Sequence, residues 1–125
     1  MKKIFTLFAA LAMVMSMSAK TIYLNTGGGG LWNQGGAKFG CHTWGSQDKS
    51  GFMTSEGGGV YSFETLDANT DVIFTRVSPS STSIWGDNGQ EWNRIQTTIP
   101  ADKDCCTITG WGESDFNWST YIPVA

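Results

Sequence analysis

Basic side chains are scarce in this sequence. Eight Lys and Arg stand against eleven Asp and Glu among 125 residues, which gives a formal net charge of −3. Lys2 and Lys3 lie in an N-terminal segment that we expect to be removed, so the remaining chain is more acidic still. A chain without a basic patch has no electrostatic attraction for nucleic acid or for an anionic membrane. We therefore expect a neutral partner, and neither nucleic acid nor a membrane.

Histidine is almost absent, which limits the chemistry. His42 is the single His, and no nucleophile signature lies near it to suggest a Ser–His–acid triad. The acidic residues fall mostly in turns, whereas glycoside hydrolysis needs two carboxylates across a cleft. Adjacent pairs such as Cys105-Cys106 also differ from the usual C-x₂₋₄-C spacing of zinc ligands. We expect no catalytic residue, no metal site and no cofactor, so the protein is predicted not to be an enzyme.

Cysteine is sparse and odd in number. Cys41, Cys105 and Cys106 are the three cysteines, and neighbouring strand residues point to opposite faces. One residue of the adjacent pair should therefore face the core, where it could form a disulfide with Cys41. An odd count also allows a disulfide between chains. The alternative is that the thiols are buried and unpaired, since free Cys behaves as a small hydrophobic residue.

Only one long apolar run is present, at the N-terminus. Residues 4–14 follow two lysines and precede the small residues Ser16, Ser18 and Ala19. This layout is typical of a secretory signal peptide, and the run is shorter than the roughly 20 residues that span a bilayer. We predict a signal peptide over residues 1–19, a single domain over residues 20–125, and a secreted or periplasmic location.

Sustained helical periodicity is also lacking, and sixteen glycines disfavour long helices. Short alternating segments separated by turn residues are present instead, and they predict an all-β, antiparallel β-sandwich. The expected strands are residues 21–25, 37–44, 52–54, 60–65, 71–77, 96–99, 105–110 and 120–124, with a polar turn at 46–51.

Tryptophan is abundant by contrast. Six Trp occur, and several lie among Gly, Asn, Ser or Asp rather than in apolar runs, among them Trp32, Trp85 and Trp92. An indole in a polar loop exposes an apolar face, which is unfavourable unless a partner covers it. The apolar face of a pyranose ring suits that role, while its hydroxyls suit polar neighbours. We expect Trp111 and Trp118 to be structural instead.

Several segments together resemble a known family. They are Asp71-Val-Ile-Phe-Thr-Arg-Val-Ser-Pro79, Trp85, Glu91-Trp-Asn-Arg-Ile95, Thr98-Ile-Pro100, Thr107-Ile-Thr-Gly-Trp111 and Asn117-Trp-Ser119. In this order and spacing the chain is similar to the starch-binding modules of carbohydrate-binding module family 26 and related bacterial α-glucan-binding modules. Segments of the first half, such as Ile22-Tyr-Leu24 and Gly59-Val-Tyr61, extend the similarity over most of residues 20–125.

The resemblance implies an immunoglobulin-like β-sandwich that binds α-1,4-glucans such as starch and maltooligosaccharides without cleaving them. It places the aromatic platform at His42 and Trp44, with Trp32 beside them, and Lys38 as a donor to a sugar hydroxyl. Trp85 and Trp92 are further candidates for sugar binding. A secreted amylase or a surface glycan-binding complex is implied as an additional partner. The alternative function is a secreted protein–protein interaction module with exposed aromatic side chains.

Overall fold

The computed structural model describes residues 18–27 and 30–123, which form nine strands and no α-helix. The strands are β1 (Ala19–Asn25), β2 (Lys38–Trp44), β3 (Lys49–Phe52), β4 (Thr54–Gly57), β5 (Val60–Leu66), β6 (Asp71–Val77), β7 (Glu91–Thr98), β8 (Cys105–Ile108) and β9 (Phe116–Ser119). The all-β class predicted from the sequence is confirmed. The predicted signal peptide lies almost entirely outside the described residues.

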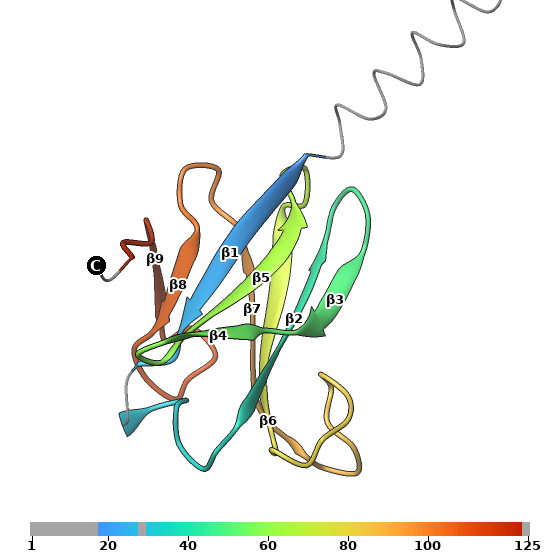
Figure 1. The fold of residues 1–125 in the computed structure, drawn as a ribbon, viewed down its shortest axis with the longest axis vertical. Coiled ribbons are helices and arrows are strands. Elements are labelled where there is room, and N and C mark those ends of the chain that lie inside the picture. Colours follow the sequence, from blue (N-terminus) through green and yellow to red (C-terminus); the bar gives the residue numbers. More distant parts are fainter. Residues whose placement is uncertain (1–17, 28–29, 124–125) are drawn as a thin grey trace, which may run out of the picture.

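Two sheets form a sandwich-like arrangement (Figure 1). The first sheet has the order β4-β5-β1-β8-β9, and the second has the order β3-β2-β6-β7. All pairings are antiparallel except that of β1 with β8, which is parallel. Strand β7 is therefore an edge strand of the second sheet.

Alternation along the strands separates the core from the surface. In β2, Phe39, Cys41 and Thr43 are buried, whereas His42 and Trp44 on the opposite face are half-buried. The register continues this division across the second sheet, because Cys41 lies opposite Phe74, which in turn lies opposite Ile95. These three side chains belong to the central apolar cluster between the sheets.

Several strand expectations were wrong. The expected strand 52–54 is divided between the end of β3 and the start of β4, with Met53 outside both. Residues 49–51 were predicted to be a turn but lie in β3, and β7 begins at Glu91 rather than at residue 96. The last strand is β9 rather than residues 120–124. Beyond Ser119 the Tyr121 backbone N–H donates to the Asp104 carboxylate (2.7 Å) instead of to a strand, so pairing stops there. Val124 lies outside the described residues.

The cysteines follow the predicted alternation. Cys106 lies opposite the buried Leu24 and Cys105 lies opposite Tyr23 on the outer face. All three cysteines are free and buried. The structure therefore agrees with the reading in which the thiols are unpaired. The described residues contain no helix long and apolar enough to cross a membrane.

Candidate functional site

The outer face of the second sheet carries the candidate site. In the register of this sheet, His42 lies opposite Ile73, and Ile73 lies opposite Gln96. Side chains on adjacent strands at matching positions are close neighbours on one face. Three strands thus place an imidazole, an apolar side chain and an amide in one row that faces away from the core.

A loop between β6 and β7, residues 78–90, folds back over part of this face. Thr75 lies on the outer face of the sheet but is fully buried, because the loop covers it. Its hydroxyl donates a hydrogen bond to the Ile84 carbonyl of the loop. Ile84 packs against Gly40 so closely that a Cβ at residue 40 would clash with the Ile84 side chain. The absence of a side chain at Gly40 therefore lets the loop lie flat on the sheet and brings the next residue, Trp85, beside the His42 row.

Polar contacts fix the loop in this position. The Lys38 ammonium donates to the Ser81 carbonyl (2.7 Å), and the Asp87 carboxylate accepts from both the backbone N–H and the hydroxyl of Thr82 (2.8 Å each). The hydrogen bonds from Thr82 hold the pKa of the Asp87 carboxyl below its usual value. Gly86 adopts a positive φ of 76°, which only glycine accepts readily, and turns the chain back immediately after Trp85.

The result is a row of three aromatic rings, which we call the His42 surface: His42, Trp44 and Trp85. The His42 ring lies 5.3 Å from the Trp44 ring at an angle of 27°, and 5.7 Å from the Trp85 ring at 60°. The rings border an open groove of about 430 Å³. Its lining is completed by Asp48, Ile73 and Gln96.

This surface offers apolar ring faces beside hydrogen-bonding groups. Trp85 is 38% exposed, and the Arg94 guanidinium lies 4.9 Å from the centre of its ring. Arg94 is in turn paired with Glu91 (2.8 Å), which compensates its charge. Such a surface suits an uncharged ligand that has one apolar face and several hydroxyl groups.

The structure brings together three of the six predicted site residues and separates the others. The prediction that Trp32 presents an exposed ring is wrong, because Trp32 is only 2% exposed and its ring stacks near Phe39 in the core. Lys38 is on the same face as His42, but its ammonium is engaged by the Ser81 carbonyl and lies over the Phe52 ring (4.2 Å). Lys38 therefore braces the loop and does not line the groove.

The exposure of the remaining tryptophans agrees only in part with their predicted roles. Trp92 is 41% exposed but lies outside the groove, next to Arg76. Trp111 was expected to be structural and is instead 50% exposed. Trp118 is half-buried and packs against the core, 6.3 Å from the Phe74 ring, as expected.

Sequence reasoning missed the polar and apolar partners of the three rings. Asp48, Ile73 and Gln96 reach the groove only because their strands and the β2–β3 turn lie beside β2. Trp92, Arg94 and Gln96 are exposed and alternate with buried or half-buried residues of β7, whereas the predicted strand began only at residue 96. Strand neighbours in space are not visible in a single sequence.

A larger groove, of about 770 Å³, lies over the first sheet. Its lining includes Tyr121 and Ile122, but the Tyr121 ring is stacked on Tyr23 with 3.8 Å between ring centres. The His42 surface is therefore the better-defined aromatic site.

Comparisons with protein-family models, with curated proteins and with solved structures found no match. Across residues 18–27 and 30–123, no cluster of three or more His, Cys, Asp or Glu side chains could hold a metal ion.

Proposed function

We propose that this protein binds an α-glucan, such as starch or a maltooligosaccharide, at the His42 surface without cleaving it. The observation that carries the proposal is the row of His42, Trp44 and Trp85 along one open groove. The residue pattern shared with starch-binding modules supplies the ligand class. The proposed location is secreted or periplasmic, where an extracellular glucan or a secreted amylase would be met.

The shape and charge of the surface support a neutral polysaccharide. Rings inclined at different angles can follow a curved chain better than a flat one, and α-1,4-linked glucans are curved. Gln96 and Asp48 lie beside the rings, where they can exchange hydrogen bonds with sugar hydroxyls. The positive charge of Arg94 beside Trp85 is compensated by Glu91.

The groove composition supports binding without hydrolysis. Glycosidases place two carboxyl groups about 5–10 Å apart on either side of the scissile bond. Asp48 is the one carboxylate among the residues that line this groove. The His42 imidazole is packed between two indoles, an arrangement that suits contact with a ring better than proton transfer.

Tryptophan fluorescence provides the first test. Titration with maltoheptaose should quench the emission, because sugar stacking changes the environment of Trp44 and Trp85. We expect a dissociation constant on the order of 10 μM to 1 mM, since a shallow groove buries little surface area. Trp44→Ala should raise it about tenfold or more.

Two outcomes would contradict the proposal. One is the absence of any fluorescence change at millimolar maltoheptaose. The other is a concentration-dependent change in oligomeric state that ignores glucans, which would favour the alternative of a protein–protein interaction module. Reducing sugar released from starch by the pure protein would overturn the non-catalytic part of the proposal.

A further inference from the structure

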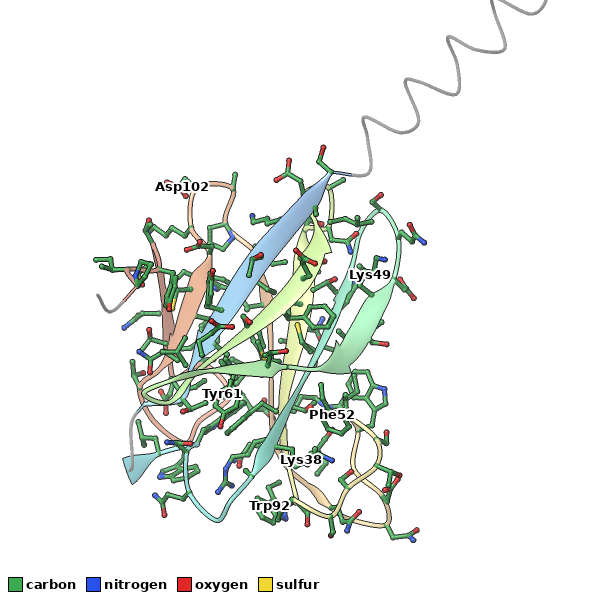
Figure 2. The ribbon with its side chains drawn as sticks, viewed as in Figure 1. Lys38, Lys49, Phe52, Tyr61, Trp92 and Asp102 are labelled. Atoms are coloured by element: carbon green, nitrogen blue, oxygen red, sulfur yellow. The ribbon has the colours of Figure 1, made fainter. Side chains whose placement is uncertain are left out.

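A second pair of exposed indoles lies outside the His42 surface. Trp92 and Trp111 are 41% and 50% exposed, and both rings contact the Arg76 guanidinium, at 4.8 and 5.4 Å. A groove of about 350 Å³ borders them, with Asn93 and Glu113 in its lining. We call Trp92, Trp111, Asn93 and Glu113 the Arg76 surface. Trp92 and Lys38 lie toward the same end of the sandwich, opposite the end that carries Asp102 (Figure 2).

Arg76 holds this surface rigidly. Its side chain is 9% exposed, and its three nitrogens donate to the Trp32 carbonyl (2.7 Å), the Gln34 carbonyl (2.9 Å) and the Asn93 side-chain oxygen (2.9 Å). These bonds fix the plane on which the two indoles rest. Burial also lowers the pKa of the Arg76 guanidinium from its usual value.

A bulge in the edge strand aims Trp92 at Arg76. Asn93 pairs with Arg76 and Glu91 pairs with Val77, so Trp92 is the extra residue between them. An extra residue bends the strand locally and redirects its side chain. The placement of Trp92 is thus built into the backbone of β7 and does not depend on a mobile loop.

The charges around the two indoles select against ionic ligands. Glu91 and Arg94 both line the groove, but they are paired with each other. Glu113 disfavours an anion, and a cation would meet the positive charge of Arg76, which lies beside both indoles. Glu113 forms no ion pair within the described residues, so its oxygens are available to accept hydrogen bonds from hydroxyl groups.

We propose that the Arg76 surface is a second sugar-binding site. A neutral pyranose unit would stack on Trp92 and Trp111, and its hydroxyls would bind to the side chains of Glu113 and Asn93. This inference rests on the proposed function, because it assigns the same class of ligand to a second place. Its own support is the pair of exposed rings fixed on a buried, fully engaged arginine.

The two surfaces are linked along one edge strand. Trp92 borders the groove of the Arg76 surface and Gln96 lines the groove of the His42 surface, four positions further along β7. Arg94 lies between them in the sequence, over the Trp85 ring and in the lining of the first of these grooves. Four residues of strand span roughly 13 Å, so the two sites are close enough for one polysaccharide to reach both. A glucan long enough to occupy both sites at once would bind more tightly than a short one, although the contacts at each site would be the same.

Indole N–H resonances in a ¹H–¹⁵N spectrum test this site directly. Each of the six tryptophans contributes one resonance, assigned through single Trp→Phe variants. On titration with maltotriose we expect the Trp92 and Trp111 resonances to shift in addition to those of Trp44 and Trp85. Trp118, which lines neither groove, should not shift. Trp44→Ala should abolish the shift of Trp85 while Trp92 and Trp111 still respond, and Ile122→Ala, outside both surfaces, should match the unmodified protein.

The outcomes separate the two proposals. Shifts confined to Trp44 and Trp85 would overturn the second site and leave the first. Shifts at Trp92 and Trp111 that disappear in Trp44→Ala would also overturn it, since they would then be transmitted from the first site. No shift at any indole would contradict both proposals.

Discussion

At the scale of single residues, the six tryptophans show how similar sequence surroundings lead to different environments. Trp32 and Trp85 both lie among Gly and Asn, yet one is buried and the other is exposed. Trp32 is covered because its ring packs in the central apolar cluster beside Phe39, while its carbonyl oxygen accepts a hydrogen bond from Arg76. Trp85 is uncovered because its own loop turns back at Gly86. Local composition therefore predicted aromatic surfaces but not which tryptophan forms them.

The buried thiols make stability dependent on pH. Burial raises the pKa of Cys41 well above its usual value and that of Cys106 to about 12. In the unfolded chain these thiols ionise near pH 8.5. Because the folded-state values are raised, the stabilisation is complete below pH 8.5 and is lost as pH rises above it. We expect urea denaturation to show a loss of roughly 2–3 kcal/mol between pH 7.5 and 9.5 under reducing conditions.

Substitution provides the control for that pH dependence. In Cys41→Ala the loss between the two pH values should be about 1.4 kcal/mol smaller, because one ionising thiol has been removed from the unfolded chain. Equal losses in Cys41→Ala and in the unmodified protein would show that the buried thiol does not determine the alkaline decline.

At the scale of elements, the loop of residues 78–90 determines the His42 surface. The loop brings Trp85 to β2, and its position depends on contacts between residues distant in sequence, such as Lys38 with Ser81. A Cβ at residue 40 would approach both Ile84 and Thr75, whereas a Cβ at Gly51 on the neighbouring strand would make an ordinary contact with Phe63 at 3.5 Å. Gly40→Ala therefore tests the loop placement, with Gly51→Ala as its control.

We expect Gly40→Ala to weaken maltoheptaose binding about five- to tenfold and to destabilise the protein by roughly 1–3 kcal/mol, because the loop must lift away from the sheet. Gly51→Ala should bind normally. Fluorescence titration and urea denaturation of both variants make the comparison. Unchanged binding by a folded Gly40→Ala variant would show that the packing of Ile84 on Gly40 does not position Trp85.

Strand existence was more predictable than strand limits or partners. Alternation in residues 71–77 predicted β6 with its observed bounds, whereas β7 was shortened because Trp92, Asn93 and Arg94 resembled a polar segment. In the structure these residues belong to an edge strand with a bulge, where polar outward side chains are tolerated. The parallel pairing of β1 with β8 joins segments about eighty residues apart, and no local pattern encodes it.

At the scale of the whole molecule, one sandwich holds two aromatic surfaces on or near the same edge. Trp32 is fully buried in the core, and Trp118 is half-buried against it. The other four tryptophans are partly or largely exposed: Trp44, Trp85, Trp92 and Trp111. The sequence predicted the all-β class and the excess of aromatic residues. It could not predict that the exposed indoles form two groups, because that division depends on how strands and loops meet.

Affinity electrophoresis in native gels with soluble starch tests the proposed glucan binding most directly. Starch should retard the unmodified protein and Ile122→Ala equally, whereas Trp44→Ala should be retarded much less, because only the Arg76 surface would remain to bind. Ile122 is 81% exposed and lies outside both aromatic surfaces, so it controls for the loss of an exposed apolar side chain. Equal migration of the unmodified protein with and without starch would contradict glucan binding at the His42 surface.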